Sequence, residues 1–67
     1  MIDTDELRGY IAKKGTSQRQ LAIKIGITEK TFYSKMDAGI FKSNEIDKMV
    51  SELGMTREEA TNIFFAH

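Results

Sequence analysis

The amino-acid sequence predicts an all-α fold, a compact bundle of five helices that forms a single domain over residues 1–67. Three observations lead to this prediction. The 67 residues include no proline, and 40% of them are hydrophobic, which suits one small core. Apolar residues recur at helical spacing in five segments. Between the segments lie Gly15, Gly26, Gly39 and Gly54, where helices have to end.

The first predicted helix runs from about Thr4 to Lys14. Leu7, Tyr10 and Ile11 form its apolar stripe, and the acidic residues at its start suit the positive end of the helix dipole. Gly9 lies inside this helix and costs up to about 1 kcal/mol relative to alanine. Either another helix packs closely against Gly9 or the helix is locally weak, and we favour close packing.

The second predicted helix runs from about Gln18 to Ile25. Ser17 and Gln20 have the spacing of a capping box, in which each side chain satisfies a backbone donor of the other residue. Gly26 then ends the helix, because glycine adopts the left-handed conformation of a helix C-terminus without strain. The residues expected to be buried are Leu21, Ala22 and Ile25.

The third predicted helix runs from about Glu29 to Asp37, with Thr28 as its N-cap. Phe32 and Met36, four residues apart, form its inward pair. Ile27 is expected to fill the corner between the second and third helices. Residues 17–36 thus contain a capped short helix, a glycine stop, an apolar corner residue and a second capped helix. This is the layout of a DNA-binding helix-turn-helix.

Two further helices are expected in the second half of the chain. The fourth follows Ser43 and runs from about Asn44 to Leu53. The fifth runs from about Arg57 to Phe65 and opens with a second capping box, Thr56 with Glu59. The residues expected to be buried are Ile46, Met49, Val50, Leu53, Ala60, Ile63 and Phe64.

Two pairs of hydrophobic residues include candidates for a contact at the surface. Phe64 and Phe65 are adjacent, and about 100° separates neighbouring side chains around a helix, so both cannot face the same core. One belongs to the core, and the other seals the first helix or forms a homodimer contact. Ile40 and Phe41 lie in the loop after the third helix, and either is a candidate partner surface.

Charge is balanced overall and uneven along the chain. Ten basic residues oppose ten acidic ones, so the formal net charge is zero. Residues 8–36 contain seven basic residues and one acidic residue, Glu29, whereas residues 1–7 and 37–67 each contain three more acidic than basic residues. A basic segment that coincides with the helix-turn-helix favours a phosphate-bearing partner, in a contact that salt would screen.

Several functional classes are disfavoured. The chain has no cysteine and one histidine, His67, so a zinc finger is excluded and we expect no metal and no cofactor. No apolar run reaches the roughly 18 residues of a membrane span, and the acidic start is unlike a signal peptide, so we expect a cytoplasmic protein. No nucleophile has an adjacent base, and capping explains the paired carboxylates, so we expect no enzyme.

The segment from Leu7 to Leu53 resembles the Cro/C1-type helix-turn-helix domain of phage repressors, the XRE family. The resemblance rests on Ser17-Gln18, Leu21-Ala22, Gly26-Ile27-Thr28, Phe32 and Gly39. The pattern Phe32 to Met36, Phe41, Glu45-Ile46, Leu53 and Ile63 to Phe65 is similar to short regulators of phages and prophages of Gram-positive bacteria. The resemblance implies a lambda-repressor-like bundle and a transcription regulator, a repressor, whose third helix enters the major groove of double-stranded DNA.

The resemblance also implies which side chains contact DNA. The expected base-contacting residues are Glu29, Lys30, Thr31 and Ser34. The resemblance implies a phosphate contact for Gln18, and the other expected phosphate-contacting residues are Arg19, Thr28, Tyr33 and Lys35. Lys30 can donate to guanine O6 and N7, and Thr31 and Ser34 can touch a thymine methyl or form hydrogen bonds. Lys35 stands where most family members have an apolar residue, which leaves its charge free for phosphate.

Two of these residues have alternative roles. Glu29 reads a cytosine, pairs with Lys30 or another basic neighbour, or serves as a helix-start acid without any contact to DNA. Tyr33 contacts phosphate through its hydroxyl or has a half-buried packing role.

The expected partner is double-stranded DNA with a palindromic or pseudo-palindromic operator, because one recognition helix reads only a few base pairs. A weak homodimer would form through this domain. The alternative is a protein-binding module, such as an antirepressor or an antitoxin-like protein, on the same scaffold. Zero net charge, Glu29 and the Ile40-Phe41 pair favour the alternative, whereas the basic segment and the motif favour DNA.

Overall fold

The computed structural model describes residues 2–65, which form five α-helices and no strand. The helices are α1 (Thr4–Lys13), α2 (Gln18–Ile25), α3 (Glu29–Ala38), α4 (Ser43–Leu53) and α5 (Arg57–Phe64). The predicted all-α class is confirmed, and each predicted helix end lies within one residue of the observed end. His67, with Met1 and Ala66, lies outside the described residues.

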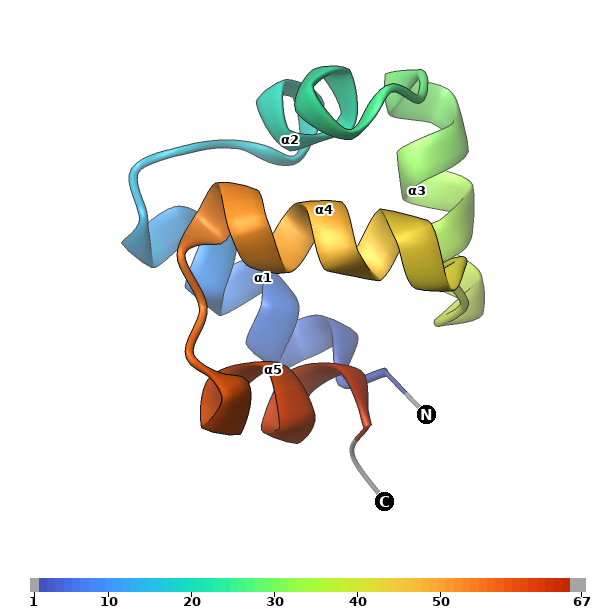
Figure 1. Cartoon of the computed structure of the whole chain (residues 1–67). Coiled ribbons are helices and arrows are strands. Elements are labelled where there is room, and N and C mark those ends of the chain that lie inside the picture. The colour runs from blue at the N-terminus through green and yellow to red at the C-terminus, as the bar shows by residue number, and fades with distance from the viewer. Residues whose placement is uncertain (1, 66–67) are drawn as a thin grey trace.

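The helix α4 crosses the middle of the molecule, with α2 on one side and α1 and α5 on the other (Figure 1). The helix α3 stands at one edge and is steeply inclined to α4. The closest packing joins α2 to α3, α2 to α4, and α1 to α5. This arrangement buries one side of α3 and leaves its other side at the surface.

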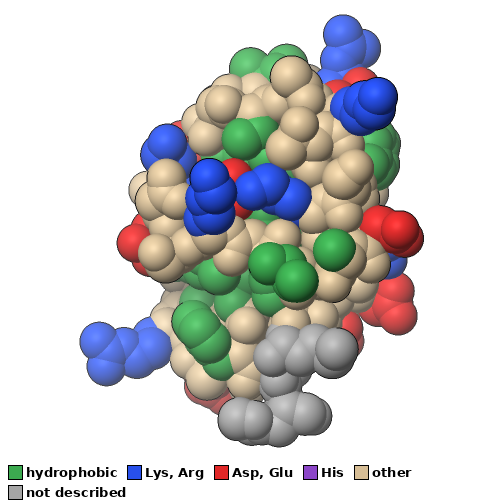
Figure 2. Space-filling model, turned by 90° about the vertical axis from the view of Figure 1, so that its right-hand side faces the viewer, with side chains coloured by type: hydrophobic (Ala, Val, Ile, Leu, Met, Phe, Trp, Pro, Cys, Tyr) green, Lys and Arg blue, Asp and Glu red, His purple; other side chains and the backbone are tan. Residues whose placement is uncertain are grey.

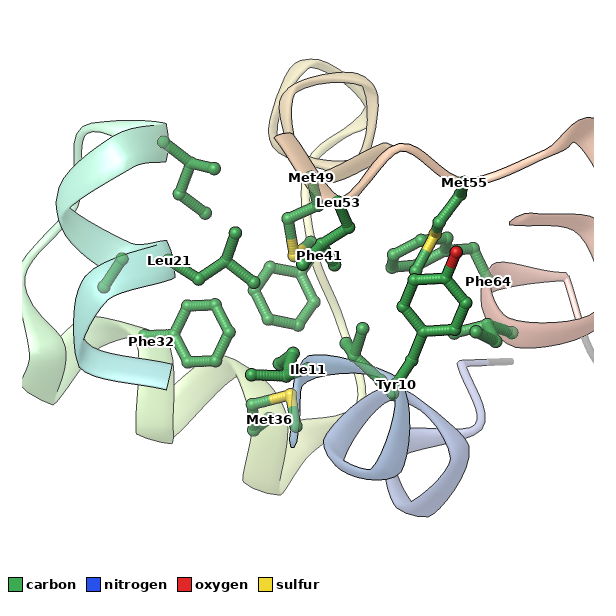
Figure 3. Packing of buried hydrophobic residues seen from close by; sticks show 14 residues of the cluster. Tyr10, Ile11, Leu21, Phe32, Met36, Phe41, Met49, Leu53, Met55 and Phe64 are labelled. Atoms are coloured by element: carbon green, nitrogen blue, oxygen red, sulfur yellow. The ribbon is translucent and has the colours of Figure 1, made fainter. Parts of the chain in front are cut away.

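One hydrophobic core holds the five helices together (Figure 3). Phe32 is fully buried and lies beside Phe41, with 5.4 Å between the ring centroids. Tyr10 lies on the side of the core where Met55 and Phe64 pack. The core therefore extends from α3 to α5, and α1 contributes side chains to both of its ends.

Most residues predicted to be buried are buried. The stripes of α1, α2 and α3 lie entirely in the core, as do Met49 and Leu53 of α4. The half-buried residues at the margin of the core are Ile27, Ile46, Val50 and Ala60, together with Ile2. Met55, in the loop before α5, is a core residue that the sequence analysis did not assign.

Side-chain caps begin α2, α3 and α5 at the predicted residues, Ser17, Thr28 and Thr56. The capping box predicted for α5 is complete. The box predicted for α2 is half formed: Ser17 Oγ accepts the Gln20 N–H at 3.1 Å, but the Gln20 side chain accepts from the Thr16 hydroxyl at 3.2 Å. Ser43 is the first residue of α4, and Lys42 occupies its N-cap position.

Gly9 differs from the expectation of close helix packing. Nothing lies within 4 Å of the position that its Cβ would occupy, so that expectation is wrong. Gly9 therefore weakens α1 without a packing reason. Gly26 has the expected left-handed conformation, with φ at +87°.

Two hydrogen bonds join the start of the chain to α5. The Asp3 N–H donates to the Ile63 carbonyl at 2.7 Å, and the Tyr10 hydroxyl donates to Glu59 Oε1 at 2.9 Å. Phe64 is the core member of the aromatic pair, and Phe65 is 59% exposed. These contacts hold α1 and α5 together on the side of α4 opposite to α2 (Figure 1).

Candidate nucleic-acid interface

The helix α3 has distinct inner and outer faces. Phe32 and Met36 are buried in the core, whereas Glu29, Lys30 and Ser34 are exposed. Thr31 is half-buried. The four residues predicted to contact bases therefore share the surface of α3 and lie within its first six positions.

Thr28 and Thr31 are engaged with each other at the start of α3. The Thr28 hydroxyl donates to Thr31 Oγ1 at 2.9 Å and accepts the Thr31 N–H at 3.1 Å. The Thr31 hydroxyl keeps its own proton for an acceptor outside the protein. Thr28 is thus primarily a cap, and Thr31 retains the capacity for one further hydrogen bond.

A hollow beside α3, here called the first hollow, collects side chains from three helices. Its polar lining includes Arg8 of α1, Gln18 and Arg19 of α2, and Glu29 and Tyr33 of α3. The structure thus brings three predicted phosphate-contacting residues next to the start of α3. Tyr33 is 50% exposed, so it combines the packed and the accessible roles that the sequence left open.

At the first hollow, the Oε1 atom of Gln18 is buried and has no hydrogen-bond partner among the described residues. A buried oxygen without a partner costs about 1–3 kcal/mol, which an incoming donor or a turn of the amide group would relieve. Gln18 is also the first residue of α2, where backbone N–H groups point out of the helix and favour anions.

Arg8 is a member of the first hollow that the sequence analysis counted only as charge. Its guanidinium lies 2.9 Å from Asp5 in an exposed ion pair. Exposed pairs of this kind contribute little to stability, so a phosphate could replace Asp5 at small cost. Sequence alone gave no reason to place Arg8 beside Gln18, because the two residues lie on different helices and line one hollow only in the folded chain.

A second hollow lies on the other flank of α3. It is lined by Lys30, Thr31, Ser34, Lys35 and Ala38 of α3 and by Ile40, Phe41 and Lys42 of the following loop. Ile40 is 69% exposed, whereas Phe41 belongs to the core, so only Ile40 remains a candidate for a partner surface. Lys42 is an exposed cation that the sequence analysis did not assign to the site.

The charge of this face is concentrated beside α3 rather than along it. On α3 itself, Lys30 is exposed together with two acidic residues, Glu29 and Asp37. Basic side chains flank the helix in the two hollows. Figure 2 shows this side of the molecule, with most of its lysine and arginine side chains over the upper half and one at the lower left, hydrophobic atoms below the central basic side chains and at the top, and acidic side chains mostly toward the margins.

Lys35 is not free, in contrast to the sequence expectation. Its ammonium lies 2.8 Å from both carboxylate oxygens of Glu45, and the Lys35 side chain is only 21% exposed. Glu45 Oε1 also accepts the Lys42 N–H at 2.7 Å. A contact between Lys35 and phosphate would therefore require this ion pair to open.

Glu45 is the buried charged residue of the described chain. Burial alone would raise the pKa of its carboxyl group, but the hydrogen bonds from Lys35 and from the Lys42 backbone outweigh burial and lower the pKa below its usual value. The carboxylate is therefore ionised at neutral pH. In the sequence Glu45 stood out only as part of the family pattern, although its position three residues after the N-cap of α4 is a signal for such a hydrogen bond.

Comparisons of the chain with protein-family models, curated proteins and solved structures gave no match. Residues 2–65 contain no group of three or more His, Cys, Asp or Glu side chains that could hold a metal ion. None of the helices in this part of the chain has the length and apolar character needed to cross a membrane. The arguments for function therefore come from the surface around α3.

Proposed function

We propose that this protein is a sequence-specific regulator of transcription that binds double-stranded DNA through a lambda-repressor-like helix-turn-helix, in the manner of a phage or prophage repressor. In this proposal α2 lies across the DNA backbone and α3 enters the major groove. The observation that carries the proposal is the outer face of α3, where Lys30, Thr31 and Ser34 line the second hollow and the first hollow, with Arg8 and Arg19, lies on the other flank of the helix.

The dimensions of α3 suit a major groove. Its ten residues give a length of about 15 Å at 1.5 Å per residue. A helix with side chains is about 10–12 Å wide, close to the roughly 12 Å width of the groove. Because α3 stands at one edge of the molecule, its outer side can approach a duplex without obstruction from the other helices (Figure 1).

The side chains around α3 form two groups in this proposal, one suited to phosphate and the other to base edges. Phosphate contacts position a protein on DNA, and contacts with base edges supply specificity. Gln18, Arg19 and Tyr33 in the first hollow are suited to one backbone strand, and Lys42 beside the second hollow is suited to the other. On the α3 side of the second hollow, Lys30 donates to guanine, and Thr31 and Ser34 contact neighbouring base edges.

The acidic residues on α3 are consistent with base reading only if their carboxylates lie away from the DNA phosphates. Glu29 lies in the first hollow with Arg8 and Arg19, which can neutralise it, and cytosine N4 is the base group that a carboxylate accepts from. Acidic groups also oppose sequence-independent binding, because they repel the DNA backbone. The balanced charge of the chain therefore suits a protein that discriminates among sequences.

Two copies of the protein bind a palindromic or pseudo-palindromic operator in this proposal. A single α3 reads a few base pairs, and half-sites one helical turn apart would double the number of base contacts. The association of the two copies would be weak in solution and strengthened on the operator.

Titration of fluorescently labelled duplexes with the protein at several salt concentrations tests the proposal. The duplexes come from selection on a random library, which also reveals whether the selected site is two-fold symmetric. We expect log affinity to fall linearly with log salt, by about 0.9 for each phosphate contact. Undetectable binding at low salt would contradict the proposal.

Matched charge variants sharpen this experiment. Arg19→Gln removes a cation from the first hollow and should make the salt slope shallower by about 0.9 for each copy of the protein bound. Arg57→Gln removes a cation from the start of α5, away from α3, and should leave the slope unchanged. Equal effects of the two variants would mean that net charge, not a defined interface, governs binding.

A protein-binding module is the second candidate, and the exposure of Ile40 favours it. An apolar side chain that is 69% exposed in a hollow with Lys30 and Lys42 could meet an acidic, apolar segment of another protein. Ile40→Ser separates the two candidates. If the protein regulates through DNA alone, this variant should retain operator affinity and stability.

A further inference from the structure

The ion pair of Lys35 and Glu45 joins the second half of α3 to the start of α4. Both carboxylate oxygens of Glu45 lie 2.8 Å from Lys35 Nζ, and Glu45 Oε1 is also 2.7 Å from the Lys42 backbone nitrogen. The backbone at the start of α4 thus holds the carboxylate, and the carboxylate holds the lysine. Among the described residues, neither side chain forms another ion pair within 4 Å, and the Lys42 charge also favours the ionised carboxylate of Glu45.

The position of Lys35 is what makes its neutralisation relevant to DNA. Lys35 lines the second hollow together with Lys30 and Lys42, which are both exposed. An unpaired lysine at this position would add a third cation on the flank of α3 where a phosphate strand would pass. Phosphate contacts made by lysine strengthen binding to every sequence and carry no base information.

DNA is a poor competitor for this lysine. The Glu45 side chain is 7% exposed, so removal of Lys35 would leave an uncompensated charge in a nearly buried site. Breaking a buried pair in this way is strongly destabilising, whereas a phosphate contact at the surface is weakened by water and salt. The lysine should therefore stay with Glu45 when DNA binds.

We infer that Glu45 is a specificity-determining positioning residue, which withholds Lys35 from the DNA backbone and so limits sequence-independent binding. This inference rests on the proposed function, because it concerns how selective the DNA contact is. Lys35 then contributes its charge to the junction of α3 and α4, and the remaining phosphate contacts come from side chains around the two hollows.

Glu45→Gln tests the inference. A glutamine can still accept the Lys42 N–H through its side-chain oxygen, so the start of α4 keeps its hydrogen bond. Without the carboxylate, Lys35 becomes available to phosphate. We expect the salt slope for a non-specific duplex to steepen by about 0.9, the non-specific affinity to rise, and the ratio of specific to non-specific affinity to fall.

Glu52→Gln is the matched control for net charge. It removes one negative charge from the same helix, and its partner Lys24 lies 3.8 Å away in an exposed pair. Under the inference, this variant changes the salt slope much less than Glu45→Gln does. Equal changes in the two variants overturn the inference, because they would show a general effect of charge.

The double variant Lys35→Gln with Glu45→Gln separates release of the lysine from loss of structure. It replaces the ion pair by two neutral amides that can form a hydrogen bond with each other. We expect its salt slope and specificity ratio to match the wild type, with helix content verified by circular dichroism. A slope shallower than wild type by about 0.9 would show that Lys35 contacts phosphate in the native protein, which overturns the inference.

A measurement without DNA distinguishes failure of the inference from failure of the proposed function. Carbon-13 NMR of the Glu45 carboxyl group should show a pKa below the usual value in the wild type, and that pKa should rise in Lys35→Gln. An identical pKa in the two proteins overturns the ion pair and with it the inference, whatever the DNA result. If the wild type has the lowered pKa but does not bind DNA, the ion pair stands. The proposed DNA-binding function and the role of Glu45 in specificity are then both overturned.

Discussion

Lys30 and Gln18 lie in different hollows beside α3, and replacing each of them by alanine should change DNA binding in a different way. Lys30→Ala removes a donor suited to guanine, so we expect a loss of about 1–3 kcal/mol in binding and a relaxed preference at one operator position. Gln18→Ala removes a phosphate contact, so affinity should fall similarly for all sequences. Binding assays on the operator and on its single-base variants measure both effects.

The contrast between these two variants is the decisive part of that experiment. A uniform loss on every sequence for Lys30→Ala would contradict its role in reading bases. Exposed Lys48 of α4 offers a control, since Lys48→Ala removes the same type of side chain outside both hollows. Its operator preference should be unchanged.

Glu45 also makes the stability of the fold depend on pH. Its pKa is lowered in the folded protein, so its stabilising effect is complete above the pKa of the unfolded chain and is lost as pH falls through the lowered folded value. We expect the Tm of the wild type to exceed that of Glu45→Gln at neutral pH. The difference should shrink below about pH 4, where carboxyl groups become protonated. Thermal unfolding followed across the acid range measures this.

A difference in Tm that persists unchanged in acid would contradict the role of the ionised carboxylate.

The sequence could not predict the pair itself, because Lys35 and Glu45 are on different helices and meet only through the angle between α3 and α4. Lys35 departs from the family pattern and was therefore expected to be free for phosphate, but the tertiary contact gives its charge a partner in Glu45.

The boundaries of the helices were predictable because local chemistry determines them. Ser17, Thr28 and Thr56 each satisfy a backbone N–H three residues along the chain, which is a contact within one turn. Glycines with positive φ end α2, α3 and α4. Neither feature depends on how the helices pack, so pattern and spacing sufficed.

Two glycines should respond oppositely to alanine. Gly26 has φ at +87°, where an L side chain is strained, so Gly26→Ala should lower the free energy of unfolding by about 1–2 kcal/mol. Gly9 lies within α1, and nothing lies within 4 Å of its Cβ position, so Gly9→Ala should raise the free energy of unfolding by up to about 1 kcal/mol. Urea denaturation of the two variants gives both values.

Each variant is a control for the other, because both add a single methyl group in open space. Destabilisation by Gly9→Ala would mean that another surface approaches α1 at this position. An unchanged stability for Gly26→Ala would contradict the left-handed end of α2 and hence the turn that sets α3 against α2.

At the scale of the whole molecule, stability depends on one small core, and Phe32 is among its fully buried residues. Phe32 is fully buried, so Phe32→Ala should cost about 3–5 kcal/mol, enough to unfold a chain of this size. Its neighbour Tyr33 is 50% exposed, so Tyr33→Ala should change stability little while weakening DNA binding. Thermal denaturation of both variants tests this, and normal stability of Phe32→Ala would contradict the core.

The sequence predicted the core residues that lie on helices better than those that lie in loops. Helical spacing identified residues such as Leu7, Leu21 and Met49, because a stripe on each helix has to face inward. Phe41 and Met55 lie in loops, where no periodicity marks them. The two hollows beside α3 were also beyond sequence analysis, since each combines side chains from segments that only the fold brings together.

The hydrogen bond between Asp3 and Ile63 also bears on how the chain could be rearranged. Because this bond brings the start of the chain against the last helix, a short linker could connect the two ends. New ends opened at the exposed loop around Gly54, far from α3, would then give a circular permutant in which α5 precedes α1 (Figure 1). Such a permutant would carry fused reporter domains on the side of the molecule opposite α3.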